Sequence, residues 1–531
     1  MIAKLKNGIL YLYLFIMLGI FPLFYKKQYA KMGTSKFQLF FYISLICLGL
    51  LFLLFLLQGI GYIKNRKHSE VTNNRIKFSM MDIGVICYSL CVILSFLFCD
   101  YKGEALLGAK GWSMGLASQM IFCAAYFFLS RDLKFRKEIL YVLFVSSSLV
   151  FLLGILHRFD IDPLKIRVGL SEENKKMFLS TIGQSSWYSS FACTVFPLGV
   201  TVFFLTKEKR MKILFGIYSA LTFMTLVTQN SDSAYLSLAA VFLLLYYVSF
   251  DKAEQKKRFL QLLILMLLSF KAIGILQVLF KERATVLDKL SIWMSQSMTT
   301  TIFFVVTVCL YLWKYHIQKR EPKNCKNRKP FYILLSAGVA VLIGTVLFIV
   351  LNSNGFLLKT FGYQNTNNYL LFQDNWGNNR GFTWKFTVSS YRDLPIMKKI
   401  FGVGPDCFKA YLYSIPEYAE RLNEYWNGLN LTNAHNEYLT VLYNLGILGF
   451  ISFLIMIFGG IFRFVKGRIQ NPYSIAFALC IASYAAHNFF CYQQVCCTPF
   501  LFIIMGIGEN ILRTDHETKN RRISDGGFTG I

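Results

Sequence analysis

Charged side chains are scarce in this sequence. Asp, Glu, Lys and Arg together make up 16% of its 531 residues, whereas a soluble domain carries about 25%. Hydrophobic residues make up 55%, and phenylalanine alone occurs 52 times. This composition excludes an ordinary soluble enzyme and indicates an integral membrane protein that is embedded in a lipid bilayer.

Paired cysteine motifs are also missing. The 13 cysteines include no CxxC pair, and none has histidine partners at the spacing of a zinc site. Most lie within apolar runs, as Cys193 and Cys309 do, where a free thiol behaves as a small hydrophobe. We therefore expect no structural metal and no metal among the site residues.

Acidic residues are outnumbered by basic ones, 28 to 56, which gives a net charge of +28. Such an excess also occurs in proteins that bind nucleic acid. Here, however, the cations lie in short clusters between apolar runs, which is the pattern of cytoplasmic loops between membrane helices. The distribution therefore argues against a nucleic-acid partner.

Apolar runs of the length that a membrane helix needs, about 20 residues, recur along the chain. We predict an all-α fold, a polytopic transmembrane bundle of about 14 spans. The expected spans are 8–24, 38–61, 82–99, 114–130, 139–157, 185–206, 212–228, 234–250, 259–280, 297–314, 331–352, 436–462, 472–490 and 498–512.

The connectors between these spans alternate in charge. The cation-rich connectors KNRKHSE, RDLKFRKE, KEKRMK, DKAEQKKR, KYHIQKREPKNCKNRK and RFVKGR fall on one side if both termini are cytoplasmic. One connector, residues 25–36, would be external despite its four lysines. We predict an N-in, C-in topology.

This topology divides the chain into four parts. Residues 1–352 contain transmembrane helices 1–11, and residues 353–433 form one long external loop with short helices. Residues 434–513 contain helices 12–14, and residues 514–531 form a cytoplasmic tail. The external loop is hardly long enough to be an independent domain.

The stretch NAHNEYLTVLYNLGILGF begins with a short run of polar residues and continues with an apolar pattern that is typical of a helix. Thr432 or Asn433 is a good N-cap, which would place His435 in the first helical turn. There the helix dipole disfavours imidazolium and leaves the ring neutral. Gly446 and Gly449 would share its face and allow a neighbouring helix to approach, so that His435 faces into the bundle. Alternatively, His435 only hydrogen-bonds a loop at the membrane boundary.

The pattern AHNEYLTVLYNLGILGF, preceded by RGFTWKF and PIMKKIFGVGPDCF, resembles the O-antigen ligase and O-antigen polymerase family of bacterial membrane glycosyltransferases. That family shows an Arg before a Trp, then a GvGp turn, then HN at the start of a helix. Here these are Arg380 with Trp384, residues 402–408, and His435. Weaker matches are TIGQSSWYSSFACTVFP and AHNFFCYQQVCCTPFLFIIMGIG, the second of which places His487.

The resemblance implies transfer or polymerisation of a glycan from an undecaprenyl-diphosphate donor onto a hydroxyl of a glycan or glycolipid acceptor. The reaction would take place on the outer face of the bacterial cytoplasmic membrane, in surface polysaccharide biosynthesis. Cleavage of the glycosyl phosphate bond supplies the energy, so no nucleotide, metal or other cofactor is expected.

The resemblance also implies roles for individual residues. Arg380 would stabilise the leaving diphosphate through its bidentate fork. His435 would act as the general base that takes the proton of the attacking hydroxyl, with Glu437 as a rival base. Asn433 and Asn436 would orient acceptor hydroxyls.

Four further residues are candidate substrate contacts. Tyr438 and Trp384 either stack on sugar faces or anchor the protein at the membrane boundary. The family often has an Arg that binds diphosphate at an outer turn, but NSDSAYL places Asp232 there. Asp232 either favours the dipole of the next helix or needs a bridging cation. Lys271, near the middle of an apolar span, is a candidate for the missing cation, or else reaches internal water.

Other membrane proteins fit part of this pattern. A lipid-linked oligosaccharide flippase or transporter would have a similar hydropathy profile, but such proteins more often consist of two related halves with broken helices. No such internal symmetry is visible here. A cell-wall polymerase of the shape, elongation and division type is a related alternative, and the HNEYL and GVGP elements favour the O-antigen family over it.

Overall fold

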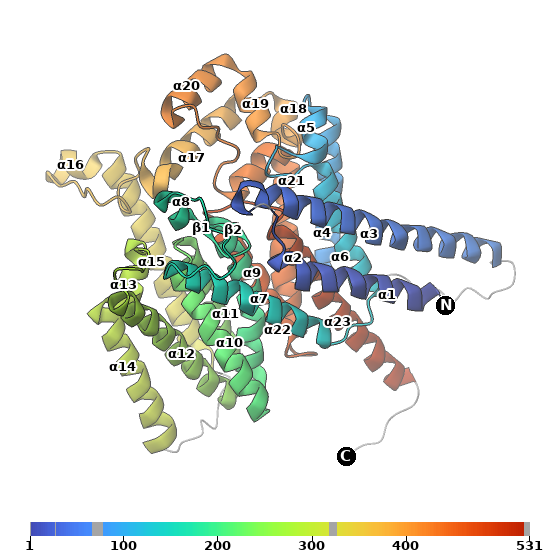
Figure 1. The fold of residues 1–531 in the computed structure, drawn as a ribbon, viewed down its shortest axis with the longest axis horizontal. Coiled ribbons are helices and arrows are strands. Elements are labelled where there is room, and N and C mark those ends of the chain that lie inside the picture. The colour runs from blue at the N-terminus through green and yellow to red at the C-terminus, as the bar shows by residue number, and fades with distance from the viewer. Residues whose placement is uncertain (1, 27, 66–77, 318–326, 525–531) are drawn as a thin grey trace.

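The computed structural model describes residues 2–26, 28–65, 78–317 and 327–524, and this part of the chain is almost entirely helical. Figure 1 shows the helices as one bundle with a group of shorter helices at one end. The strands in the described residues are β1 (Phe178–Leu179) and β2 (Gly183–Gln184), which pair antiparallel. The predicted all-α class is confirmed.

The helices follow one another with short connections. In chain order they are α1 (Ile2–Phe15), α2 (Phe21–Leu23), α3 (Met32–Asn65), α4 (Met80–Leu97), α5 (Lys102–Leu107), α6 (Leu116–Asp132), α7 (Glu138–Arg158), α8 (Glu172–Met177), α9 (Ser185–Leu205), α10 (Lys209–Thr228), α11 (Ser233–Ser249), α12 (Ala253–Leu279), α13 (Lys289–Gln296), α14 (Met298–Leu312), α15 (Lys329–Ser353), α16 (Phe356–Phe361), α17 (Trp376–Asp393), α18 (Ile396–Phe401), α19 (Phe408–Ser414), α20 (Pro416–Trp426), α21 (Glu437–Gly467), α22 (Ser474–His487) and α23 (Thr498–Ser524).

Every predicted span coincides with helix in the structure. Within the described residues, ten helices are long and apolar enough to cross a membrane, and α11 and α22 are shorter apolar helices. The two remaining predicted spans, 114–130 and 498–512, coincide with α6 and α23. The chain is therefore a multi-pass membrane protein.

The helices differ in how deeply they lie in the bundle. In the most apolar 18-residue stretch of α9, 89% of the residues are buried, whereas in that of α15 none is buried. Helix α9 packs against α10 and α22, and α21 packs against α4 and α22. Helices α9 and α22 therefore form the centre, and α15 presents apolar side chains outward, as a lipid-facing helix does.

Helices α17–α20 gather at one end of the bundle, together with α5 (Figure 1). Their side chains form a separate core that also takes in Cys99 after α4, Ala105 from α5 and Tyr443 from α21. Residues 353–433 thus contain the predicted short helices. Because their core needs residues of the membrane helices, this segment packs on the bundle and is not self-contained.

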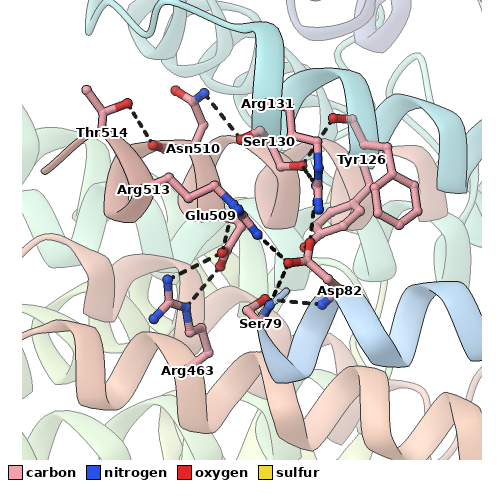
Figure 2. A network of polar contacts seen from close by, with 11 residues as sticks. Ser79, Asp82, Tyr126, Ser130, Arg131, Arg463, Glu509, Asn510, Arg513 and Thr514 are labelled. Atoms are coloured by element: carbon pink, nitrogen blue, oxygen red, sulfur yellow. Dashed lines mark hydrogen bonds and ion pairs between the residues drawn. The ribbon is translucent and has the colours of Figure 1, made fainter. Parts of the chain in front are cut away.

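The opposite end of the bundle carries buried ion pairs. Figure 2 shows two carboxylates, Asp82 and Glu509, whose side chains are 0% exposed, surrounded by three arginines. Arg131 Nη1 lies 3.2 Å from Asp82 Oδ1, and Arg463 Nε lies 3.0 Å from Glu509 Oε2. Arg513 contacts both carboxylates. The network joins α4, α6, α21 and α23, and it compensates charges that would otherwise be costly to bury.

The cation-rich connectors around 131–138, 251–258 and 463–468 share this end, because the ion pairs link their helices. Residues 66–70 and 318–326 of two other such connectors lie outside the described residues. In the exceptional connector 25–36, Lys36 is fully buried and donates to the carbonyl oxygen of Phe21 at 2.7 Å. At least this lysine is therefore engaged with the backbone and does not reach solvent.

Replacing Asp82 by asparagine is expected to destabilise the protein by roughly 3–5 kcal/mol, because Arg131 and Arg513 both lose their buried carboxylate partner. Thermal unfolding of the detergent-solubilised protein measures this effect. The control is Glu172→Gln, since the carboxylate of Glu172 is 83% exposed and pairs with Lys175 on the surface. Equal unfolding temperatures for the two variants would contradict the prediction.

Candidate active site

Helix α21 is interrupted at Gly446, which has φ 68° and ψ −174°. The carbonyl groups of Tyr443 and Asn444, just before the break, accept hydrogen bonds from outside the helix. The backbone N–H groups of Val403 and Gly404 donate to these two carbonyls at 3.1 and 3.0 Å. The GVGP turn therefore docks into the broken helix, and each side satisfies polar groups of the other.

Glycine is required on both sides of this contact. A Cβ at Gly402 would lie 2.1 Å from the Asn444 oxygen, and a Cβ at Gly446 would lie 2.2 Å from the Ile400 oxygen. Gly446 thus permits a close approach, but by the backbone at the end of α18 and not by a membrane helix. A Cβ at Gly449 would meet Leu445 of its own helix. The expectation that both glycines mark one helix–helix face was wrong, because the break at Gly446 changes the direction of the helix.

Asp406 follows the GVGP turn directly and was not singled out from the sequence. Its Oδ2 accepts hydrogen bonds from the backbone N–H groups of Ala109 and Met114 at 2.8 and 3.0 Å, which holds the α5–α6 loop. Burial raises the pKa of Asp406 to about 7. The position next to the GVGP turn is the sequence signal that could have identified it.

Asp406 also lines a cavity of about 40 Å³. One water molecule needs about 10–15 Å³ of accessible cavity volume, so the cavity has room for a few waters but not for a sugar ring. Its walls are formed by Tyr88, Trp112, Met114, Gln119, Pro405, Asp406, Asn433, Glu437, Thr440, Val441, Asn444, Leu445, Tyr492 and Gln493. A glycan must therefore bind beside this cavity or widen it.

His435 lies before helix α21 and not in its first turn. The N-cap is Asn436, whose Oδ1 accepts from the Leu439 N–H at 3.0 Å. His435 itself has φ 49°, in the left-handed region, and its N–H donates to Asn433 Oδ1 at 2.9 Å. The expected N-cap at Thr432 or Asn433 was wrong, because the Asn433 side chain forms this local turn instead.

The His435 ring is neutral for another reason than the helix dipole. Burial and then the positive charge of Arg380 lower the pKa of His435 to about 4. The ring packs edge-on against Tyr492, with 5.3 Å between ring centroids. A neutral imidazole can accept a proton, and an anion bound at Arg380 would raise its pKa toward the working pH.

Arg380 follows an irregular first turn of α17, in which Gly377, Asn378 and Asn379 have φ values of 58°, 61° and 66°. Its guanidinium donates to the Gly377 oxygen at 2.6 Å and to the Phe490 oxygen at 2.8 and 3.2 Å. These acceptors are neutral carbonyls. Within the described residues no carboxylate forms an ion pair with the guanidinium by direct contact, so its positive charge is fixed by carbonyl groups alone.

The segment 490–493 joins the two predicted catalytic residues. Its first carbonyl binds Arg380, and the Tyr492 ring contacts His435. The structure therefore brings Arg380 and His435 to the same connector, between α22 and α23. Tyr492 had no signal in the sequence, because its contacts come from segments far away along the chain.

Glu437 is held in a buried chain of hydrogen bonds that does not include His435. Tyr484 donates to Glu437 Oε1 at 3.1 Å, and Asn488 Nδ2 donates to Oε2. This bond fixes the orientation of the Asn488 amide, so that its Oδ1 faces His487. An amide oxygen can only accept, and it therefore accepts from His487 Nδ1–H at 2.8 Å. His487 Nε2 then accepts from the Ser189 hydroxyl at 2.8 Å. The chain fixes the orientation of Glu437 and the tautomer of His487.

The remaining predicted contacts are used within the protein. Asn433 and Asn436 hold the turn before α21 through their side-chain oxygens. The Tyr438 hydroxyl donates to the Ala485 oxygen at 2.9 Å. Trp384 stacks on Phe490, with 5.7 Å between centroids. These contacts support the site from within, and stacking of Tyr438 or Trp384 on a sugar stays a prediction.

Asp232 and Lys271 lie in different surroundings. Asp232 stands at the start of α11 and makes no capping hydrogen bond; the Tyr369 hydroxyl donates to its Oδ2 at 3.4 Å. Its charge acts on that of Arg380. Lys271 donates to the Ser297 oxygen at 2.9 Å and to Thr300 Oγ1 at 2.7 Å, so it joins α12 to α14. Asp232 therefore lies within electrostatic reach of Arg380, whereas Lys271 links two membrane helices.

Residues 283–454 match the family model described as O-Antigen ligase. The match covers this segment, which is less than half of the chain. It contains Arg380, the GVGP turn and His435, whereas Asp232 and Lys271 lie outside it. The resemblance predicted from the 380–450 motifs is confirmed, and it indicates glycan transfer of the ligase or polymerase type in surface polysaccharide synthesis. No curated protein matches the chain.

Proposed function

We propose that this O-antigen ligase-like enzyme moves a glycan from an undecaprenyl-diphosphate donor to a hydroxyl of a glycan or glycolipid acceptor. The observation that carries the proposal is the pair formed by Arg380 and His435. A guanidinium held by carbonyl groups alone and a neutral imidazole flank the same connector, residues 490–493. A cation can stabilise a leaving anion and a neutral imidazole can take the proton of a hydroxyl, so the pair suits a reaction with both steps.

In the proposed step the acceptor oxygen attacks the anomeric carbon of the donor sugar. The bond from this carbon to the phosphate oxygen breaks, and the lipid diphosphate leaves with the electron pair. His435 takes the hydroxyl proton, and Arg380 stabilises the charge that develops on the diphosphate. Glu437 is engaged by Tyr484 and Asn488, which favours His435 over Glu437 as the base.

Deleting the gene and sizing the surface polysaccharide tests the proposal. Accumulation of single lipid-linked repeat units would identify a polymerase, and accumulation of long unattached lipid-linked chains would identify a ligase. An unchanged polysaccharide profile would contradict both. Transfer by the purified enzyme in EDTA tests the expectation that no metal is required.

The same proposal requires that α17–α20 and His435 face the outside of the cell, where the lipid-linked donor is presented. In a cysteine-reduced background, Asn367→Cys should react with an impermeant maleimide in intact cells. Lys466→Cys, exposed at the opposite end of α21, should react only after the cells are opened. Labelling of the Lys466 position in intact cells would show that the predicted orientation is wrong.

A further inference from the structure

A second polar pocket, of about 550 Å³, lies at the end of the bundle opposite α17–α20. It is formed where α11 ends, α12 begins, α15 begins and α21 ends. Helix α11 has 17 residues, so the pocket lies about 25 Å from Asp232 and the catalytic end. The pocket therefore cannot take part in glycan transfer directly.

The pocket has an excess of positive charge. Arg328, Arg468 and Lys252 line it, and Asp251 is the carboxylate among its lining residues. Arg468 Nε lies 2.9 Å from Asp251 Oδ2, and Arg328 pairs with Asp251 Oδ1. Both oxygens of Asp251 are thus already used, and two positive charges are left over.

The two arginines are held in place. The Tyr247 ring lies 4.4 Å from the Arg328 guanidinium carbon and 5.2 Å from that of Arg468, and the Tyr247 hydroxyl accepts from Arg328 Nη1 at 3.0 Å. Arg328 Nε is buried and has no hydrogen-bond partner among the described residues. A buried donor without an acceptor is costly, so the Arg328 guanidinium still has hydrogen-bonding capacity for an anion.

Apolar residues complete the pocket wall. Leu205, Val248, Ile469 and Pro472 line it, and Ile469 is 84% exposed. An exposed isoleucine beside fixed arginines, at the end of membrane helices, suits a molecule with a charged head and a hydrocarbon tail.

We propose that this pocket binds the phosphate headgroup of an anionic phospholipid. The guanidiniums of Arg328 and Arg468 and the ammonium of Lys252 contact the phosphate, and the acyl chains lie along Ile469. A soluble phosphate compound shares the headgroup chemistry but lacks the chains. This inference does not rest on the proposed glycan transfer.

Native mass spectrometry and thermal unfolding of the detergent-purified protein test the proposal, with phosphatidylglycerol, phosphatidylcholine and inorganic phosphate as probes. Phosphatidylglycerol should bind saturably and raise the unfolding temperature more than phosphatidylcholine does. Lys252→Gln should weaken this binding roughly fivefold, as expected for one cation at an anionic headgroup, while leaving the Asp251 ion pairs intact. Lys466→Gln, which removes an exposed charge two residues before Arg468, should bind like the unmodified protein.

A second variant tests whether weaker binding results from misfolding. Arg328→Gln removes one cation and leaves Asp251 paired with Arg468, so no buried carboxylate is left unpaired. It should bind phosphatidylglycerol more weakly at a nearly unchanged unfolding temperature without lipid. Equal binding of the two lipids, or unweakened binding by both Lys252→Gln and Arg328→Gln, would overturn the proposal. Competition by inorganic phosphate at the lipid's own concentration would overturn the assignment to a lipid.

Discussion

Replacing His435 by alanine is expected to lower glycan transfer by about 10²–10⁴-fold, the usual loss when a general base is removed. The backbone of His435 is fixed by the Asn433 turn, and its ring contacts Tyr492. The assay uses purified enzyme in detergent with a lipid-linked donor and measures initial rates. The protein level and unfolding temperature of the variant should stay close to those of the unmodified enzyme.

The matched control is Glu437→Gln, which keeps the shape of the side chain and removes its charge. Glutamine retains one of the two acceptor oxygens that Tyr484 and Asn488 use, so one buried hydrogen bond is lost. We expect a rate loss of about tenfold or less. Normal turnover by His435→Ala together with an inactive Glu437→Gln would transfer the base role to the glutamate.

The pH dependence of kcat/KM gives an independent measure of His435. Its pKa is lowered from the ordinary value of 6.5 to about 4, first by burial and then by Arg380. The neutral ring is the active form, so it is lost only as the pH falls through this lowered pKa. We therefore expect no loss of kcat/KM that depends on His435 between pH 8 and about pH 5. A limb near pH 6.5 that disappears in His435→Ala would contradict this environment.

Replacing Arg380 by alanine is expected to abolish transfer, and Arg380→Lys is expected to recover little of it. Removal of one fixed donor to a developing negative charge typically costs about 10²–10³-fold in kcat. Lysine keeps the charge but lacks the planar guanidinium. The guanidinium donates to the carbonyls of Gly377 and Phe490 and, in the proposed step, also to the diphosphate. Steady-state rates at saturating donor separate this loss from weaker donor binding.

Arg392→Ala is the control for this prediction, since Arg392 lies on the same helix, α17, and is exposed. It removes the same charge and should leave the rate within about twofold, as a screened surface cation does. Full activity of Arg380→Lys would show that Arg380 supplies only general positive charge.

The prediction of the membrane spans from local sequence was accurate, whereas the predicted N-cap of α21 was not. The membrane spans follow from runs of apolar residues, and each predicted run is helical in the structure. Arg380, the GVGP turn and His435 followed from short motifs, and the family match covers all three. Local motifs did not reveal that the GVGP turn docks into a break at Gly446, because the partner carbonyls lie about 40 residues further along the chain.

The sequence by itself determined the membrane helices and the resemblance to the O-antigen ligase family, because the length of apolar runs and the order of motifs can be read directly along the chain. Only the tertiary structure decided which polar groups remain available for chemistry. Glu437 is engaged by Tyr484 and Asn488, and Lys271 by Ser297 and Thr300, whereas Arg380 finds a carbonyl 110 residues away and no carboxylate in the described chain. A polar side chain in a bundle takes its partners from neighbouring helices, so its role is set by packing and not by its place in a motif.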